Sequence, residues 1–365
     1  MQESYIDDPG QLLALCEQIR HSPWLALDTE FVREKTYSAN LCLIQLCNGE
    51  LAACIDPLAL VDLTPLQEIL MDPQVVKIFH AGHQDLEIFH QLWGQLPEPL
   101  FDSQIAATLL GIGDQIGYAN LVQQLLGHEL EKGHTRTDWS RRPLNPAQLR
   151  YALDDVIYLG EIYQVLKAQL QARQRESWLQ EEMQKLSDPA TYANSPAQMW
   201  KRIRGQHHLK GAQRAVLQAL AAWRETEAER VNRPRRWILK DDVLLELARR
   251  QPEDLTALAR IHGLEAGVVQ HSGDKLLELI AAGKALPQAE WPLNDQRPPQ
   301  LTPEQTVMMD RLTDYLRETA EQQALSPTLL ANRRDMEKLV TGERDLAVLQ
   351  GWRKKLVGEH LLEML

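Results

Sequence analysis

Residues 24–37, "WLALDTEFVREKTY", join an apolar run to two acidic residues that are one position apart. The run "WLALDTEF" has the length and composition of a strand inside a sheet. In a strand, residues i and i+2 point to the same face about 7 Å apart, so Asp28 and Glu30 project two carboxylates into one space. Such like charges raise each other's pKa unless a cation neutralises them, and hard divalent ions bind carboxylate oxygens. The pair is therefore a candidate metal site, the alternative being a strand that ends in a polar turn.

Three more apolar runs predict strands: "NLCLIQLC" at 40–47, "LAACID" at 51–56 and "VVKIFH" at 75–80. The first three strands lie close together in the chain and predict an antiparallel meander. The fourth follows a helical stretch at 66–70, and we expect it to run parallel to one of them. From Asn145 onward the periodicity is almost wholly helical. The pattern predicts an α/β domain followed by helices.

Composition excludes several classes of protein. A chain of 365 residues is long enough for two or three domains. It contains no apolar run approaching the ~20 residues that span a bilayer, and "MQESYIDDPG" lacks the features of a signal peptide. We expect a cytoplasmic protein without a membrane segment. Cys16, Cys42, Cys47 and Cys54 have no C-x-x-C spacing, which favours free thiols over a zinc site.

The formal net charge of −12 conceals a basic segment. Residues 201–240 carry eleven Lys or Arg and only three acidic residues. Local charge decides phosphate binding more than the total does, so this segment is a candidate nucleic-acid contact. The alternative is a solvated helical surface.

Two later motifs add carboxylates. In "VVKIFHAGHQDLEIFHQL", Asp85 lies in the first turn of a predicted helix, where it serves either as a third carboxylate at the sheet end or as a helix cap. In the predicted helix "QLRYALDDVIYLGEIY", Tyr151 and Asp155 lie one turn apart and share a face. Asp154 is farther from the apolar stripe than Asp155, which makes Asp155 the better candidate.

The helical half contains two linkers and a repeat. Pro and polar residues concentrate at 187–198 and again at 286–303. Residues 223–248 align without a gap to residues 316–341 at an offset of 93, with Pro234 matching Pro327 and Asp242 matching Asp335. "GDKLLELI" from Gly273 likewise resembles "GEHLLEML" from Gly358. We interpret this as a duplicated helical domain.

The order of these motifs, D-x-E on a strand, then a second Asp, then Y-x-x-x-D on a helix, resembles the tyrosine form of the DEDD exonuclease family. The sequence segments that contain or flank these motifs, "LDTEF", "HAGHQDLEIF", "TDWSRRPL" and "LRYALDDVIYL", resemble that family too. The helical repeats resemble HRDC domains. The resemblance implies an α/β ribonuclease-H-like (DnaQ-like) exonuclease domain with a mixed sheet, followed by two all-α HRDC domains. The implied boundaries are 1–170 for the exonuclease, 171–205 for a helical linker, 206–286 for the first HRDC domain, 287–302 for a Pro-rich linker and 303–365 for the second.

The resemblance also implies a chemistry. The family hydrolyses the terminal phosphodiester at a 3′ end and releases nucleoside 5′-monophosphates, and two divalent cations, Mg²⁺ or Mn²⁺, assist the reaction. Asp28, Glu30, Asp85 and Asp155 would hold the ions, and Tyr151 would position the attacking water. The implied substrate is an RNA with an accessible 3′ end, tRNA precursors above all.

Further residues are candidates for contact with RNA. Unpaired bases commonly stack on aromatic side chains, which makes Phe31 and Trp139 candidates, with Arg141 and Arg142 for phosphate. In and before the first repeat the candidates are Lys201, Arg202, Arg204, Lys210, Arg233, Arg235 and Arg236. Two alternatives remain at this point: a DNA-directed 3′–5′ exonuclease with the same fold, and a non-catalytic nucleic-acid adaptor.

Overall fold

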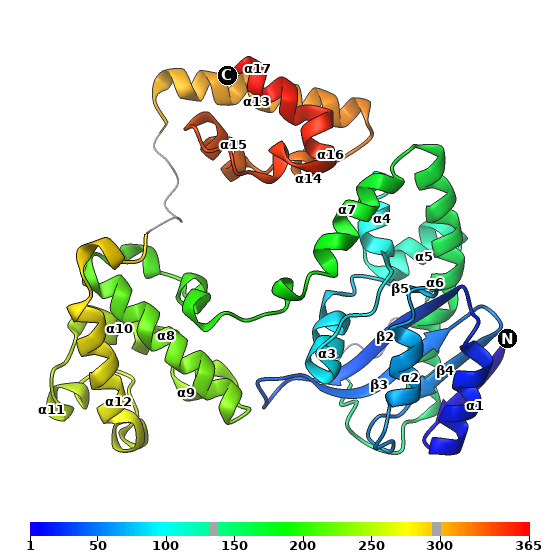
Figure 1. Cartoon of the computed structure of the whole chain (residues 1–365), viewed down its shortest axis with the longest axis horizontal. Helices are drawn as coiled ribbons and strands as arrows, with labels where there is room; N and C mark the ends of the chain where they lie inside the picture. Colours follow the sequence, from blue (N-terminus) through cyan, green and yellow to red (C-terminus); the bar gives the residue numbers. More distant parts are fainter. Residues whose placement is uncertain (131–136, 294–300) are drawn as a thin grey trace. The chain divides into compact units, whose positions relative to one another are not determined.

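A computed structural model describes residues 1–130, 137–293 and 301–365 (Figure 1). These residues form two compact units. The first comprises Met1–Val32, Leu41–Tyr192 and Pro298–Leu365, and the second comprises Arg33–Asn40 and Ala193–Arg297. Each unit is described by itself below.

The first unit is built around a mixed sheet. Within the described residues its strands have the order β1-β4-β3-β2-β5-β6. Their bounds are β1 Gln2–Ile6, β2 Trp24–Val32, β3 Asn40–Cys47, β4 Leu51–Ile55, β5 Val76–Phe79 and β6 Leu100–Asp102. Strands β3 and β4 are antiparallel, whereas the pairs β1–β4, β2–β5 and β5–β6 are parallel. The four predicted strands are confirmed, as is the expectation that "VVKIFH" runs parallel to one of the first three; the structure shows that its parallel neighbour among them is β2. Strands β1 and β6 were not predicted.

Helices cover this sheet, and the last part of the chain packs with them. The helices between Met1 and Tyr192 are α1 Pro9–Ile19, α2 Thr64–Leu70, α3 His83–Trp93, α4 Ser103–Leu109, α5 Tyr118–Leu126, α6 Pro146–Ala172, α7 Glu176–Leu186 and the 3₁₀ turn η1 Pro189–Thr191. The carboxy-terminal elements are α13 Pro303–Gln322, α14 Pro327–Leu330, α15 Arg333–Val340, η5 Ala347–Leu349, α16 Gly351–Arg353, the π-helical η6 Lys354–Gly358 and α17 Glu359–Met364. Trp178 of α7 stacks on Trp352 of α16 at 4.4 Å, and Arg353 pairs with Glu182 at 2.6 Å.

The central strands explain why the early runs are so apolar. Leu25, Ala26 and Leu27 on β2 are consecutive and all at most 1 % exposed. Strand β3 is buried almost without interruption from Cys42 to Cys47. A strand covered on both faces buries successive residues rather than alternate ones. Polar side chains at the end of β2 are therefore the exception that needs an explanation.

The second unit is helical apart from the segment Arg33–Asn40, which continues β2 toward β3. Its elements are η2 Pro196–Arg202, η3 Gln206–His208, α8 Ala212–Arg230, α9 Arg235–Ile238, α10 Asp241–Arg250, α11 Leu255–Leu258, α12 Ala266–Ala285 and η4 Gln288–Glu290. A separate apolar core includes Leu217, Leu220, Leu244 and Leu276. The Pro-rich linker predicted at 287–302 lies partly outside the described residues, which stop at 293 and resume at 301.

The described helices also bear on membrane association. Among the residues described, none forms a helix with both the length and the apolar character needed to cross a bilayer.

Candidate active site

The carboxylate pair lies in the second half of β2. Asp28 and Glu30 are partly exposed, whereas Thr29 between them is buried at 6 % exposure. The alternation is that of an extended strand, in which successive side chains point to opposite faces. The predicted common face of Asp28 and Glu30 is therefore present in the structure.

Helix α6 brings the next carboxylate to this face. Asn145 caps the helix with a reciprocal capping box, and Pro146 occupies its first turn, which is why the helix begins there. Farther along, Gly160 lies against the indole of Trp24 so closely that a Cβ at this position would be 2.3 Å from the ring. The missing side chain lets α6 approach β2, and Asp155 lies on the same helix.

Three carboxylates converge at this point. One oxygen each of Asp28, Glu30 and Asp155 lie within 4.8 Å of one another. The hydroxyl of Tyr151, one turn before Asp155, donates a hydrogen bond to the Asp155 carboxylate. Asp154 instead forms an ion pair with Arg150 at 2.8 Å, and Arg150 also contacts Glu3. The choice of Asp155 over Asp154 thus agrees with the geometry.

Asp85 approaches from a different element. It lies in the first turn of α3 and is 7 % exposed. Its carboxylate accepts a hydrogen bond from the Thr29 hydroxyl. Asp85 is not among the three residues whose oxygens lie within 4.8 Å of one another, yet its charge raises the pKa of both Asp28 and Glu30. Asp85 therefore lies beside the cluster rather than in its centre.

Burial and neighbouring negative charges raise the pKa of all four carboxyl groups. Burial, followed by the charges of Asp85, Asp155 and Glu30, raises the pKa of Asp28 well above its ordinary value. Burial and the neighbouring Asp155 and Asp85 raise the pKa of Glu30 to about 8. Burial also raises the pKa of Asp155 to about 7 and that of Asp85 to about 6. Adjacent carboxylates that resist ionisation together are a site for cations, because a cation removes the repulsion.

The residues that support the cluster were not predicted from the sequence. Asp102, buried at the end of β6, accepts hydrogen bonds from Gln104 N and Ile105 N at the start of α4 and from Gly82 N in the turn before α3. Tyr118 donates to the carbonyl oxygen of Asp154 at 3.0 Å. The "FDSQ" cap pattern signals the first role of Asp102, but these contacts join segments far apart in sequence, so no local pattern reveals them.

Two expected RNA contacts need correction. Trp139 is only 3 % exposed, and its ring centroid lies 6.2 Å from that of Tyr151, so it is packed inside the first unit. Arg142 forms a bidentate pair with the buried Asp56 and donates to the carbonyls of Cys42 and Trp139. A guanidinium occupied in this way serves packing rather than phosphate binding. Arg141 remains highly exposed and pairs with Asp138 at 3.0 Å.

The remaining candidates differ in exposure. Phe31 is partly buried next to Glu30 on β2. In the second unit, Arg235 pairs with Glu225 and lies over the Tyr37 ring at 5.0 Å. The exposed candidates in that unit are Arg202, Arg204, Lys210, Arg233 and Arg236, and Lys201 is partly buried.

Comparison with known proteins agrees with this geometry. A family described as "3'-5' exonuclease" matches residues 4–171, and the HRDC domain matches residues 213–280. The chain is 41 % identical over 356 residues to "Ribonuclease D" of Granulibacter bethesdensis, an alignment that covers 97 % of this chain and 90 % of that protein. It is 42 % identical over 358 residues to "Ribonuclease D" of Gluconacetobacter diazotrophicus, with the same two coverages.

A solved structure gives the same result. The crystal structure of Escherichia coli RNase D, described as an exoribonuclease involved in structured RNA processing, matches with a TM-score of 0.89 at 33 % identity. The match covers 100 % of this chain and 98 % of that chain. The predicted ribonuclease-H-like mixed sheet followed by helices is thereby confirmed.

A mixed sheet that carries this carboxylate cluster and matches the exonuclease family defines a metal-dependent 3′–5′ exonuclease. The chain belongs to the ribonuclease D family, and it is a 3′–5′ exoribonuclease. This identification favours the exoribonuclease prediction over a DNA-directed nuclease or a non-catalytic adaptor.

Proposed function

We propose that the chain removes nucleotides one at a time from RNA 3′ ends, using Asp28, Glu30, Asp85 and Asp155 to hold two divalent cations, Mg²⁺ or Mn²⁺. The observation that carries this proposal is the convergence of Asp28, Glu30 and Asp155 within 4.8 Å, with the Tyr151 hydroxyl bonded to Asp155. When bound, the two ions would supply charge neutralisation for the attacking and leaving oxygens and a lowered pKa for the attacking water. Nucleoside 5′-monophosphates are the expected products.

Tyr151 then acts as a positioning group for water. Burial and the charges of Asp155, Glu30 and Asp28 raise its pKa above the ordinary value. The hydroxyl therefore stays protonated at neutral pH and is a hydrogen-bond donor rather than a base. With this role for Tyr151, the chain is proposed to belong to the tyrosine form of the DEDD exonucleases. Phe31, partly buried beside Glu30, is the proposed wedge against the terminal base.

The preferred substrate is proposed to be a tRNA precursor with extra 3′ residues. The solved relative from Escherichia coli is described as acting in structured RNA processing, which supports a folded RNA with a free 3′ end. All four cysteines, each within the described residues, are free and buried, as is usual in a reducing compartment. We therefore place the activity in the cytoplasm.

The carboxy-terminal helices are proposed to be a second HRDC domain. The long helices α8 and α13 are each followed by a helix of four residues, α9 and α14, and then by α10 and α15. Pro234 precedes α9 and Pro327 begins α14, in agreement with the sequence repeat. Of the two, the first domain carries the positive charge. The proposed contacts with the RNA body are therefore Lys210 and Arg233 within it and Lys201, Arg202 and Arg204 in the segment before it. Arg141 is proposed to contact phosphate near the active site.

The test is a time course on a 5′-labelled RNA with an unpaired 3′ tail and on its DNA counterpart. Reactions contain Mg²⁺, Mn²⁺ or chelator, and wild type is compared with Asp28→Asn and with Asp154→Asn as the matched control. We expect metal-dependent shortening of the RNA from its 3′ end, lost in Asp28→Asn and retained in Asp154→Asn. Equal shortening of DNA would overturn the assignment of RNA as the preferred substrate, and activity in Asp28→Asn would overturn the metal-ligand assignment.

A further inference from the structure

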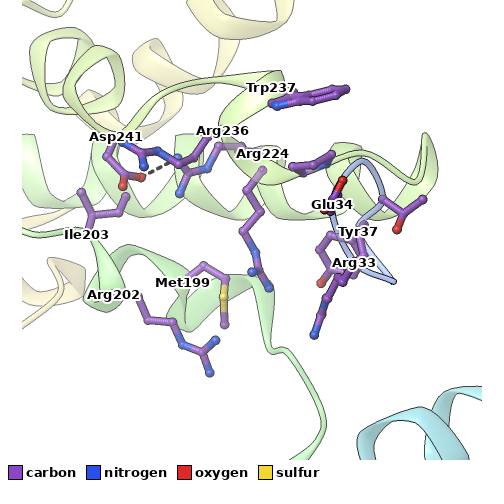
Figure 2. A pocket seen from close by; sticks show the side chains of 13 residues that line it. Arg33, Glu34, Tyr37, Met199, Arg202, Ile203, Arg224, Arg236, Trp237 and Asp241 are labelled. Atoms are coloured by element: carbon purple, nitrogen blue, oxygen red, sulfur yellow. Dashed lines mark hydrogen bonds and ion pairs between the residues drawn. The ribbon is translucent and has the colours of Figure 1, made fainter. Parts of the chain in front are cut away.

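The second unit contains a cavity of about 460 Å³ that the proposed chemistry does not use (Figure 2). Its walls come from three segments that are distant in sequence: the segment Arg33–Asn40, the turn η2 and the region of α8 and α9 (Figure 2). The lining residues that matter here are Arg33, Arg202, Arg224, Arg235, Arg236 and Trp237. A volume of this size is in the range of small-ligand sites. We call it the arginine–tryptophan pocket.

The segment Arg33–Asn40 is held in place as one wall of this pocket. The Tyr37 hydroxyl donates to Glu225 of α8, and Asn232 accepts hydrogen bonds from the backbone N–H groups of Tyr37 and Ser38. Arg235 pairs with the same Glu225 and lies over the Tyr37 ring. The Tyr37–Glu225–Arg235 group is therefore structural, and it shapes the cavity without needing a ligand.

The pocket nevertheless keeps an excess of positive charge. Its lining contains five arginines and two acidic residues, Glu34 and Asp241. Arg224 is neutralised by Asp241 at 2.7 Å, a contact drawn in Figure 2, and Arg235 by Glu225. Arg236 is exposed and has no ion-pair partner among the described residues, and the hydrogen bond of Arg202 to Asn194 is long, at 3.5 Å. These two guanidinium groups are available to an anion.

Trp237 adds an aromatic surface to the same site. The side chain follows Arg236 on α9 and is 59 % exposed, so it does not belong to the apolar core of this unit. An indole left in water beside cationic groups offers a stacking surface for an unpaired base, and every base has a π-face to present to it. Phosphate binding by arginine and base stacking by tryptophan together match one kind of ligand, a nucleotide.

We propose that the arginine–tryptophan pocket binds an unpaired nucleotide within the RNA substrate, with its phosphates at Arg202 and Arg236 and its base on Trp237. This inference rests on the proposed exoribonuclease function. The pocket shares no residue with the carboxylate cluster, so it is a second binding site on the same RNA. Two tethered sites raise the effective concentration of the 3′ end without a tight site at either.

The first measurement is equilibrium binding of the full chain to a 5′-fluorescein-labelled unstructured RNA, with chelator present so that the RNA stays intact. Trp237→Ala is expected to raise Kd by roughly 5- to 100-fold, and Trp237→Phe to restore most of the affinity, because the phenyl ring still stacks. Arg236→Glu is expected to flatten the plot of log K against log salt by about 0.7 or more. Arg249 is an exposed arginine on α10 outside the pocket lining, so Arg249→Glu is the matched control. Its Kd should stay close to that of the wild-type protein.

Two results would overturn the inference: binding by Trp237→Ala and Arg236→Glu that equals binding by Arg249→Glu, or a loss in Trp237→Ala that Trp237→Phe does not restore. Titration with adenosine 5′-monophosphate distinguishes a pocket that binds a nucleotide within RNA from one that binds a free mononucleotide. If the pocket variants lose this mononucleotide but still bind RNA like wild type, the pocket serves free product and the RNA assignment is wrong.

Hydrolysis of a dinucleotide separates this inference from the proposed function. A dinucleotide bound at the carboxylate site has no further nucleotide that could enter the pocket. The pocket variants should therefore cleave it at the wild-type rate. If wild type fails to cleave any RNA with metal present, the proposed function fails, whatever the binding data show. If wild type cleaves RNA and only the binding prediction fails, the pocket inference alone is wrong.

Discussion

Gly160 of α6 packs directly on the indole of Trp24 at the start of β2: a Cβ on Gly160 would lie 2.3 Å from Trp24 Cη2. The same strand carries Asp28 and Glu30, and the same helix carries Asp155. This close approach therefore sets the spacing of carboxylates that come from distant parts of the chain.

Gly160→Val should damage stability and metal binding together. The added side chain pushes α6 away from β2, and overpacking of this kind costs about 1–3 kcal/mol. We expect a lower Tm and weaker Mg²⁺ binding, measured by calorimetry on the metal-free protein and by Mg²⁺ titration. Gly267→Ala, on α12 with nothing within 4 Å of the added Cβ, is the matched control. Unchanged Mg²⁺ affinity in Gly160→Val would show that the helix spacing does not matter.

The stability of the metal-free protein should fall as pH rises through the range in which the cluster ionises. Glu30, whose pKa is raised to about 8, and Asp155, raised to about 7, bind more protons when folded than when unfolded. The stability that their protonated forms provide is therefore fully present below the ordinary carboxyl pKa, and it is lost as pH rises through about 7 and 8. Because one pKa unit corresponds to about 1.4 kcal/mol, we expect a loss of several kcal/mol between about pH 5 and pH 8 in chelator.

Asp28→Asn should reduce this dependence of the free energy of unfolding on pH, because it removes one of the repelling charges. In the wild-type protein, Mg²⁺ should restore more stability at high pH than at low pH. Urea unfolding at several pH values measures both effects. Asp310→Asn, an exposed carboxylate on α13 whose charge does not contribute to the raised pKa values of the cluster, should behave like wild type in its slope. An identical slope in Asp28→Asn would contradict the mutual repulsion.

Thr29→Val should weaken metal binding without touching a proposed ligand. The substitution keeps the shape of the side chain and removes the hydroxyl that donates to Asp85. Supporting hydrogen bonds of this kind are commonly worth 10- to 100-fold in metal affinity or activity. We expect a Mg²⁺ dependence of RNA cleavage shifted by roughly 10-fold, and Thr29→Ser should retain the wild-type value. An unshifted Thr29→Val titration would remove this hydrogen bond from the site.

Tyr151→Phe should slow turnover and leave metal binding largely intact. The phenyl ring preserves packing but no longer bonds Asp155 or orients water, so we expect kcat to fall by at least about 100-fold. Tyr158→Phe on the same helix is the control, because its ring packs against His128 at 5.2 Å instead. Loss of Mg²⁺ binding in Tyr151→Phe would show that its role is structural.

Arg142→Ala should destabilise the fold without a specific effect on RNA binding. Its removal leaves the buried Asp56 without its bidentate partner, a change that costs about 2–4 kcal/mol for a partly buried pair. Although burial acts in the opposite direction, hydrogen bonds from Arg142 and Tyr5 hold the pKa of Asp56 below its ordinary value. The pair thus stabilises the protein above the ordinary carboxyl pKa, and its contribution is lost as pH falls through the lowered value. A raised KM for RNA with unchanged Tm would restore the original phosphate-contact prediction.

The sequence by itself was sufficient for the local elements. Strands β2, β3, β4 and β5 follow from apolar runs, and the Asn-Pro start of α6 follows from its capping residues. The choice between Asp154 and Asp155 followed from helical periodicity alone. These features depend on residues a few positions apart, whose geometry is set by the backbone itself.

Only the tertiary structure decided which side chains support the site and which support the fold. Trp139 and Arg142 look like RNA contacts in a linear motif, but burial and the pair with Asp56 assign them to packing. No local pattern reveals the long-range contacts of Thr29, Asp102 and Tyr118. Thr29 bonds Asp85, Asp102 bonds the turn before α3, and Tyr118 bonds the carbonyl of Asp154, across gaps of 20 to 56 residues. Hydrogen bonding and exclusion from water depend on neighbours in space, and a single sequence without its fold does not specify those neighbours.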